Sequence, residues 1–351
     1  MKKEIFLETI CSFIILMIVL AFSTFSQAQT PKPFTTLEQK LYEASKKEGQ
    51  VEWWDEHSLT EATAYINAFE ARYPGVKVIF WGAQEDTRNE KYFMDHQSGR
   101  HTLDIHSTNQ YLRYKKEGLL TDLSDLIEDV GYPKDYHTSD SLGTAIEFTL
   151  YGGAYNAKRV QPNDVPRSWE DLLDPKWKGK IAMDRRMKLF IFFTEYWGEE
   201  KVVDYLKKLK EQKPIFSKGG TLMATMLGAG EFPIALDVLL HRIIIMQRKG
   251  SPVTWMPINP IVLRPVQPNV VLRHAPHPNA AKLFLRYWMS NEGQALVDKI
   301  RIKGNPLPGT GTAPSKVVEK LGLKIHSASE WTLANMNRLE KLYQVAIGYK
   351  Q

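Results

Sequence analysis

The stretch Val165–Met183, VPRSWEDLLDPKWKGKIAM, decides the fold class of this 351-residue chain. Ser168 is a residue type that commonly caps a helix N-terminus, and the short apolar run after it predicts one brief helix. Asp174-Pro175 ends that helix, because proline cannot continue it. A lysine-glycine-lysine turn then leads into a short apolar strand, Ile181–Met183. Taken alone, this order of helix, turn and strand is compatible with any α/β protein.

A second stretch, His274–Gln294, HAPHPNAAKLFLRYWMSNEGQ, agrees with the first. The two tryptophans, Asp-Pro and Lys-Gly-Lys of Val165–Met183 resemble the entry into the second lobe of bacterial extracellular solute-binding proteins. The resemblance is to their iron(III)-type group, which serves ABC importers. His274–Gln294 resembles the helix by which that family returns to its first lobe, and weaker similarity extends from Leu37 to Leu307.

The first part of the chain alternates strands with helices. Helices are expected at Leu37–Lys47, Leu59–Tyr73 and Thr87–Gln97, and strands at Gln50–Asp55, Val76–Trp81 and Thr102–His106. Such alternation favours a mostly parallel sheet covered by helices. The family resemblance implies an α/β, two-lobed fold of the type II periplasmic binding proteins, in which each lobe is a mixed sheet flanked by helices.

The predicted lobes are discontinuous in sequence. The first lobe is expected to comprise residues 36–145 plus 270–351, and the second lobe residues 150–265. Two extended, proline- or glycine-bearing segments, residues 145–155 and 260–272, would connect them. Their resemblance to family hinges implies that the lobes close on a ligand.

Composition restricts the class of partner. The chain has 43% hydrophobic and 25% charged residues, which is a globular composition. Its formal net charge of +6 is mild and forms no basic block, so nucleic acid is not an expected partner. The expected partners are a small-molecule ligand and the membrane permease of an ABC importer, with the protein itself a monomer. A protein that serves a sensor kinase instead of a permease would have the same sequence features.

Residues 1–28 read as a secretory signal peptide and predict a periplasmic protein. A basic start precedes the apolar run Ile10–Phe22, and Ser26-Gln27-Ala28 fits a small-x-small cleavage site. Cys11, the one cysteine, lies inside this run, so a lipoprotein anchor is not expected. The alternative is an uncleaved membrane anchor, but the run is shorter than the ~20 apolar residues that span a bilayer.

Candidate ligand-binding residues follow the predicted strands, because open α/β sheets bind ligands at strand carboxyl ends. They are His57, Ser58, His106, Ser107, Arg185, Arg186, Asp237 and His241, with Tyr151 added from the first hinge segment. Gly219, Gly220 and Thr221 are added because they precede a predicted helix, so their backbone amides could point at an anion, which Arg185 or Arg186 would also meet. Each has a structural alternative: the serine after His57 could only cap a helix, the arginines could be surface charges, and the two glycines could form a turn. Asp237 and His241 would share one helical face and could pair with each other.

The sequence favours a small anionic solute or a metal chelate as ligand. Iron-binding members of the family use adjacent tyrosines after a strand like Gly230–Leu236, and here Asp237 and His241 occupy that region. Ferric iron bound by the protein alone is the alternative, with Tyr151 and Tyr155 as substitutes. The metal ligands are left unassigned, no cofactor is assigned, and a colourless protein is expected.

An enzyme is not expected. The chain has no G-x-S-x-G, H-E-x-x-H, Walker or dinucleotide motif. The competing hypothesis is a metal-assisted hydrolase that uses His57, His106, Asp237 and His241. Such an enzyme would need an open metal position and an activated water, whereas a capture protein needs only closure.

The first prediction concerns export. The charge pattern and Ser26-Gln27-Ala28 predict cleavage before Gln29. N-terminal sequencing of the exported protein should therefore begin at Gln29. A mature chain that still begins at Met1 would favour a membrane anchor.

Overall fold

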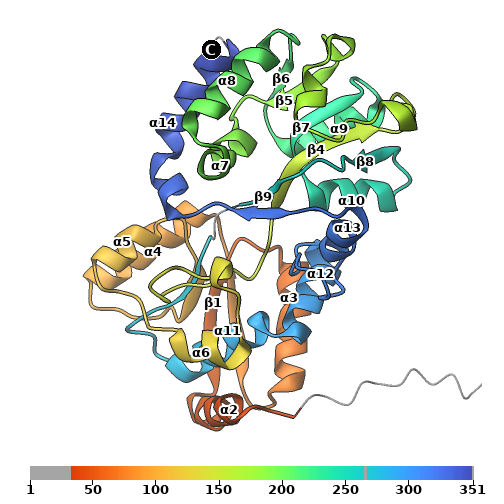
Figure 1. Ribbon diagram of the computed structural model, residues 1–351. Coiled ribbons are helices and arrows are strands. Elements are labelled where there is room, and N and C mark those ends of the chain that lie inside the picture. Colours follow the sequence, from red (N-terminus) through yellow and green to blue (C-terminus); the bar gives the residue numbers. More distant parts are fainter. Residues whose placement is uncertain (1–32, 265–266, 350–351) are drawn as a thin grey trace, which may run out of the picture. The chain divides into compact units, whose positions relative to one another are not determined.

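The computed structural model describes residues 33–264 and 267–349. The predicted signal peptide and cleavage site lie outside the described residues. The strands form two mixed sheets flanked by helices, as the sequence predicted (Figure 1). Among the described helices, none is both long and apolar enough to cross a membrane.

The first sheet has the strand order β10-β3-β1-β2. β1 pairs in parallel with β2 and β3, and β10 pairs antiparallel with β3. Its strands are β1 (Gln50–Asp55), β2 (Lys77–Gly82), β3 (Ile105–Ser107) and β10 (Asn269–Val271). The helices that follow or flank these strands are α2 (Thr36–Glu48), α3 (Leu59–Arg72), α4 (Glu85–Gln97), α5 (Tyr111–Lys116), α6 (Ser124–Val130), α11 (Pro278–Met289), α12 (Asn291–Arg301) and α13 (Ala313–Leu321), with the 3₁₀ turn η1 (Lys134–Tyr136).

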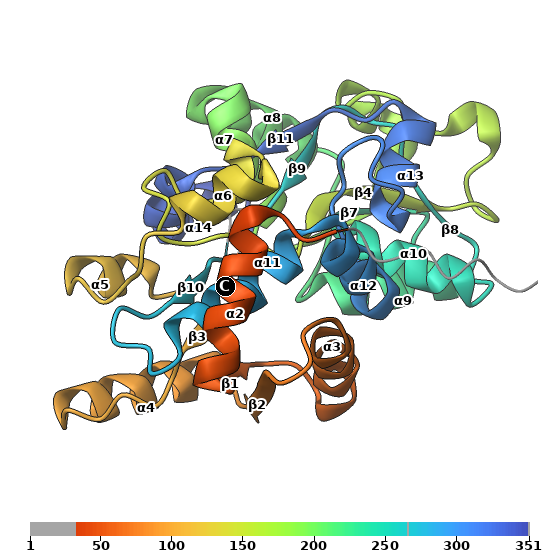
Figure 2. The ribbon, with the colours of Figure 1, turned by 90° about the horizontal axis from the view of Figure 1, so that it is seen from below.

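Trp53 of β1 forms the centre of the core beneath this sheet. It is 1% exposed and packs on Phe284 and Trp288 of α11, with ring centroids 5.4 and 5.3 Å apart. Figure 2 shows α11 lying beside α2, and the two helices are in contact. The return helix expected from His274–Gln294 therefore does pack under the first sheet, because its aromatic face meets Trp53.

The second sheet has the order β11-β9-β4-β7-β5-β6, and β8 pairs with β4. Its strands are β4 (Leu150–Asn156), β5 (Ile181–Asp184), β6 (Ile215–Ser217), β7 (Ile234–Leu239), β8 (Val253–Trp255), β9 (Ile261–Leu263) and β11 (Ile325–Ser327). Its helices are α7 (Lys188–Trp197), α8 (Glu199–Lys210), α9 (Gly220–Ala229), α10 (Leu240–Arg248) and α14 (Glu330–Ile347), with the 3₁₀ turns η2 (Pro162–Asp164), η3 (Glu170–Leu173) and η4 (Pro175–Trp177). β5, β6 and β7 are parallel to one another.

Val165–Met183 forms the expected turns and strand. Ser168 Oγ accepts a hydrogen bond from the Asp171 amide at 3.1 Å, so the serine does stabilise the start of η3. Trp169 and Trp177 are 3% and 5% exposed and join the core of the second sheet. The chain then enters β5, which lies between β6 and β7.

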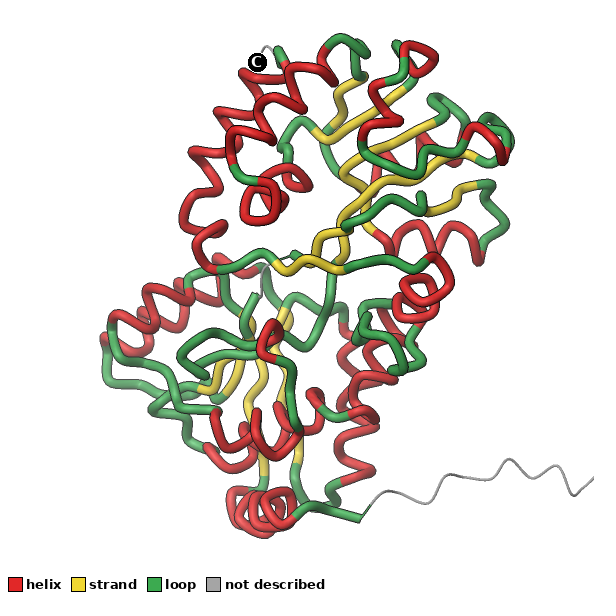
Figure 3. The backbone as a smooth tube through the Cα atoms, in the orientation of Figure 1, coloured by secondary structure: helices red, strands yellow, loops and turns green. Residues whose placement is uncertain are grey.

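The two extended crossover segments run side by side. Leu150 of β4 pairs with Leu263 of β9, and Tyr151 pairs with Val262, in antiparallel register. In Figure 3 these strands connect the regions of the two sheets. The hinge role of residues 145–155 and 260–272 remains a prediction.

The C-terminal segment differs from the expected division of the chain, which placed residues 270–351 in the first lobe. β11 pairs with β9 of the second sheet, and α14 contacts α7 and α8 (Figure 1). The reason is the apolar face of α14: Leu339 and Tyr343 are fully buried in the core of the second sheet. Tyr343 also shares a 2.7 Å hydrogen bond with Thr194 of α7.

The junction of α11 and α12 generates a stability prediction. A Cβ added at Gly293 would meet the Tyr287 carbonyl oxygen and lie 2.7 Å from Trp288 Cα. Both obstacles are backbone, so Gly293→Ala should destabilise the protein by about 1–3 kcal/mol. Chemical denaturation measures this, with Asn291→Ala, at an exposed position of the same turn, as the control. Equal stability of both variants would contradict the tight contact.

Candidate functional site

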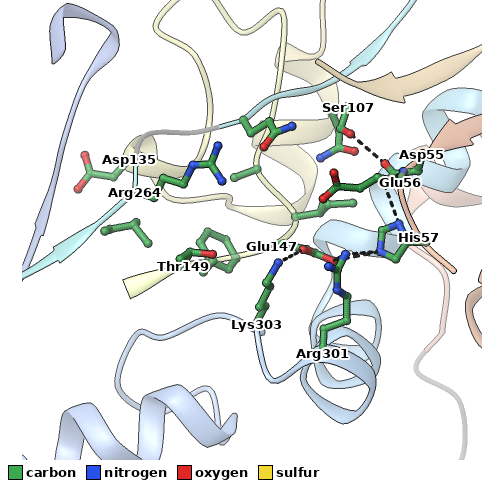
Figure 4. Close-up of a pocket in the computed structure, with 16 residues that line it drawn as sticks. Asp55, Glu56, His57, Ser107, Asp135, Glu147, Thr149, Arg264, Arg301 and Lys303 are labelled. Carbon is green, nitrogen blue, oxygen red and sulfur yellow. Dashed lines mark hydrogen bonds and ion pairs between the residues drawn. The ribbon is translucent and has the colours of Figure 1, made fainter. Parts of the chain in front are cut away.

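A pocket of about 70 Å³ lies where the carboxyl ends of β1 and β3 approach the crossover segments (Figure 4). The end of β1 supplies Asp55 to it and the end of β3 supplies Ser107. Its lining residues are Asp55, Glu56, His57, Ser107, Asp135, Ala145, Ile146, Glu147, Phe148, Thr149, Leu263, Arg264, Gln267, Asn269, Arg301 and Lys303. The carboxyl edge of the sheet is where α/β folds bind ligands. Of the residues proposed from sequence, His57 and Ser107 therefore line one pocket.

His57 lies between two carboxylates. Its Nδ1 is 2.7 Å from Asp55 Oδ1 and its Nε2 is 3.0 Å from Glu147 Oε1. Burial disfavours the charged imidazole, but Asp55 and Glu147 outweigh that cost and raise the pKa of His57 to about 9. At neutral pH the ring is therefore an imidazolium, and both of its nitrogens donate.

Glu147 holds three donors at once. Arg301 Nη1 donates to its Oε1 at 2.9 Å, and Lys303 Nζ donates to its Oε2 at 2.9 Å. Burial acts to raise the pKa of Glu147, but Lys303, His57 and Arg301 hold it well below its usual range. Arg301 Nη1 also lies 3.1 Å from His57 Nε2. Because both of these atoms carry protons, they share the carboxylate rather than bond to each other.

A buried arginine supports Asp55 from behind. Ser107 Oγ donates to Asp55 Oδ2 at 3.0 Å, and the fully buried Arg88 contacts Ser107 Oγ at 3.2 Å. Burial would raise the pKa of Asp55, but His57 and Arg88 lower it. A continuous chain of polar contacts thus runs from Arg88 on α4 to Lys303 beyond α12.

These contacts define the Glu147 network, which consists of Arg88, Asp55, His57, Glu147, Arg301, Lys303 and Glu61. Glu61 belongs to it because its Oε1 lies 3.6 Å from Arg301 Nε. Four of the members are positive and three are negative, which leaves one excess positive charge. Every carboxylate in the network already accepts a hydrogen bond or an ion-pair contact. The network therefore offers a ligand positive charge rather than unpaired carboxylates.

Three further charged residues line the pocket, and all three are exposed: Glu56, Asp135 and Arg264. The Arg264 guanidinium has no hydrogen-bond partner among residues 33–264 and 267–349. Its charge lowers the pKa values of Tyr151 and Lys188, although burial is the larger influence on both groups. The charge of Arg264 therefore acts on Tyr151 and Lys188, which belong to the second sheet and to the helix that follows β5.

Other polar groups of the second sheet gather at the carboxyl ends of β5 and β6. Asp184 accepts hydrogen bonds from Arg186 Nε at 3.0 Å and from the Gly219 amide at 3.1 Å. Gly219 has φ +104°, a conformation that glycine adopts without strain, and it immediately precedes α9. Arg186 and Gly219, both proposed from sequence as anion donors, are thus brought together by Asp184.

The structure places Asp237 inside β7, so the expectation that it shares a helical face with His241 is wrong. Gly152 pairs with Val238 and Gly153 with Leu236, which leaves Asp237 as the extra residue of a β-bulge with φ +62°. Its carboxyl is buried and makes no hydrogen bond of ordinary geometry among the described residues, although the Leu189 amide favours its charged form. Burial and the neighbouring Asp184 raise the pKa of Asp237 to about 8.

Several other candidates have local structural contacts. Ser58 caps α3 in a capping box: its Oγ accepts from the Glu61 amide at 3.3 Å, and its own amide donates to Glu61 at 3.0 Å. Arg185 donates to the Tyr349 hydroxyl at 3.1 Å, next to α14. Gly220 begins α9, and Thr221 after it is exposed.

The other two candidate histidines, His106 and His241, are buried. His106 is fully buried beside Tyr92 and Tyr114, and burial lowers its pKa to about 3. Burial, together with Lys303, also lowers the pKa of His241 to about 3. No group of three or more His, Cys, Asp or Glu side chains in the described part of the chain is arranged to hold a metal ion.

The side chains of Tyr151 and Tyr155 pack in and against the core of the second sheet. Tyr151 packs edge-on against Phe192 with ring centroids 5.2 Å apart, and Tyr155 packs against the same cluster. Burial raises the pKa of Tyr151 to about 12, which opposes formation of a phenolate.

Sequence reasoning missed Glu147, Arg264, Arg301 and Lys303. Glu147 and Arg264 lie within the two segments predicted as hinges, and this position was the available signal. Arg301 ends α12 and Lys303 follows it closely, far along the chain from the strand ends that were searched.

Comparison with known proteins decides the family. The family model for bacterial extracellular solute-binding proteins matches residues 64–320. The chain belongs to this family. An uncharacterized protein of Haemophilus influenzae is 26% identical over 165 residues, which are 44% of this chain and 47% of that relative. The chain thus spans about half the length of that curated relative.

Solved structures show the same fold as this solute-binding protein. The Trichodesmium protein IdiA (FutA), solved with iron and citrate ligands, has a TM-score of 0.68 and 18% identity, covering 86% of this chain and 100% of that one. AfuA from Actinobacillus pleuropneumoniae, solved with fructose-6-phosphate, has a TM-score of 0.58 and 21% identity, covering 86% and 99%.

The position of His57 predicts a pH dependence. Its pKa is raised from 6.5 to about 9, so the folded state binds a proton that the unfolded state has released between these values. The contribution to stability is complete below pH 6.5 and is lost as pH rises through 9. The unfolding free energy of the parent should fall by roughly 3 kcal/mol more than that of His57→Gln over this range. Denaturant melts across pH measure it, and parallel profiles would contradict the imidazolium assignment.

Proposed function

We propose that this protein is a periplasmic solute-binding protein of an ABC importer, which captures a small anionic solute or a metal chelate. The Glu147 network carries the proposal: it places the cationic side chains of Arg301 and Lys303 in the lining of a pocket at the carboxyl ends of β1 and β3. Opposite charge and charge-assisted hydrogen bonds are the means by which such a pocket holds an anion. Family membership supports the transport role.

Ferric iron bound directly by the protein fits these residues poorly. A metal needs neutral imidazole or vacant carboxylate oxygens, whereas His57 carries protons on both nitrogens and Glu147 accepts three donors. Tyr151 lies in the core of the second sheet, and Tyr155 is partly buried against it. A chelate whose own groups hold the metal avoids these demands. The structure of the Trichodesmium protein contains iron together with citrate.

The proposal includes binding without turnover. His57, His106, Asp237 and His241 would have to share a metal in the competing hydrolase, but the last three are buried among other side chains. Delivery to a permease, the periplasmic location after removal of residues 1–28, and a monomeric state belong to the same proposal. Nucleic acid is not proposed as a partner, since the charged groups of the pocket include both signs.

Native mass spectrometry of the exported protein tests this function. The parent should carry a small molecule that is released unchanged on unfolding. Thr149 lines the pocket, so Thr149→Trp should fill it and remove the bound molecule. Thr225→Trp, at an exposed position of α9 outside the pocket lining, is the matched control and should retain it. A Thr149→Trp protein that retains the same solute, or a parent that binds none from periplasmic extract, would contradict the proposal.

A further inference from the structure

We propose that His96, His101 and His274 bind one divalent transition-metal ion at the end of the first sheet opposite the pocket. None of the three histidines lines the pocket, so the inference does not depend on the proposed function. It follows from the meeting of three imidazole rings, from their lack of other partners, and from the hydrogen bonds that fix the backbone around them.

Three separate segments bring these histidines together. His96 lies in the last turn of α4, His101 lies in the connection from α4 to β3, and His274 follows β10. Because β10 runs antiparallel to β3, the end of β10 lies beside the start of β3, with Val271 paired to Ile105. The pocket lies at the carboxyl end of β3. The three histidines therefore gather at the other end of the same sheet.

The imidazole rings are spaced as ligands of one ion would be. Their centroids are 5.4 Å apart for His96 and His101, 4.8 Å for His101 and His274, and 6.0 Å for His96 and His274. Three imidazoles on a tetrahedral ion, with metal–nitrogen distances of about 2.0–2.1 Å, have centroids roughly 5 Å apart. The observed separations therefore leave room for one ion between the rings.

The rings must turn before their nitrogens meet at one point. As the side chains now stand, no group of three in the described part of the chain surrounds a metal position. Rotation about the Cβ–Cγ bond re-aims the ring nitrogens but barely moves the ring centre, because that bond points at the ring. This torsion has broad energy wells in histidine, so the rotation costs little. The positions of the rings, rather than their present angles, define the site.

The ring nitrogens have no other partner. Among residues 33–264 and 267–349, none of the three imidazoles makes a hydrogen bond, and Nδ1 of both His96 and His101 is buried without a partner. His277 differs, because its Nδ1 lies 2.8 Å from Asp104 Oδ2. Imidazole binds a metal ion through an unprotonated nitrogen. Each of the three rings can therefore offer a nitrogen without breaking a hydrogen bond to the described residues.

Hydrogen bonds fix the backbone on both sides of the cluster. The Arg100 amide donates to the Asp95 carbonyl at 2.9 Å, which turns the chain back against the end of α4. The Leu272 amide donates to the Asp104 carbonyl at 3.0 Å, which holds the end of β10 beside the start of β3. An ion would thus bind to segments that are already ordered, and the ordering of loops is one of the main costs of binding.

The ligand set selects the kind of ion. Imidazole nitrogen suits zinc, copper and nickel, whereas magnesium and calcium prefer oxygen ligands. His274 is exposed, so water can supply a fourth ligand, as it does in zinc sites with three protein ligands. A bound ion would join the end of α4 to the segment that leads from β10 into α11. It would therefore stabilise the folded protein, because the unfolded chain does not hold the three rings together.

The test titrates zinc into the exported protein at pH 7.5, after the protein has been prepared without an affinity tag and stripped of metal. A chromophoric chelator that competes for zinc reports the affinity. The parent should bind one zinc ion per chain, and zinc should raise its unfolding temperature. His101→Gln and His274→Gln should each weaken binding at least about tenfold, because each removes one of three ligands.

His326→Gln is the matched control. His326 is also a partly buried histidine with an unpartnered ring nitrogen, but the ring that it contacts belongs to Tyr196 and not to another histidine. This variant should bind zinc as the parent does. Circular dichroism verifies that each variant is folded.

Two results would overturn the inference. One is a parent protein that binds no zinc. The other is zinc that His101→Gln and His274→Gln bind as tightly as the parent, which would be an adventitious ion only. Either result leaves the proposed solute-binding function standing, because its test depends on Thr149 in the pocket. Failure to find a bound solute would, in turn, leave the zinc site unaffected.

Discussion

The imidazolium of His57 between Asp55 and Glu147 is the interaction on which the architecture of the pocket depends. Asp55 is buried and Glu147 is half-buried, and without a positive charge between them each carboxylate would remain uncompensated in a medium of low dielectric constant. His57 supplies that charge, and Arg301 and Lys303 supply the rest. Removing one member leaves the others buried and unbalanced.

The same interaction connects parts of the chain that are distant in sequence. Asp55 ends β1, Glu147 precedes β4, and Arg301 and Lys303 lie at and beyond the end of α12. The network therefore ties the edge of the first sheet to the crossover segment that leads into the second. Its geometry also decides what the pocket can bind, since its acceptors are consumed internally and its donors are in excess.

Much of this arrangement could be predicted from the sequence. Gln50–Asp55 forms β1 as expected, because its apolar side chains, Trp53 among them, are buried in the core. Ser58 caps the following helix, as its spacing with Glu61 indicates. The two motifs also located the entry into the second sheet and the return helix beneath the first. The local sequence pattern was sufficient to predict an element wherever residues within that element determine where it begins and ends.

The rest depends on tertiary contacts that leave little local signal. The register shift opposite Gly152 and Gly153 extends β7 past Asp237, so a residue expected on a helix lies in a bulge. Arg301 and Glu147 are ordinary charged residues until folding places their side chains 2.9 Å apart. α14 packs beside the second sheet because Leu339 and Tyr343 are buried in its core, and Tyr343 also hydrogen-bonds Thr194. The large separation of these residues in sequence leaves no local signal of these contacts.

Nitrogen-15 NMR of the His57 imidazole tests the central claim most directly. With uniformly labelled histidine and His57→Gln to assign the signal, both ring nitrogens should report a protonated imidazolium at pH 7.5. The titration midpoint should lie near 9, as the pKa of about 9 requires. A midpoint near 6.5, or a neutral ring at pH 7.5 whose signal shifts when ferric iron is added, would contradict the charge network and favour a direct metal site.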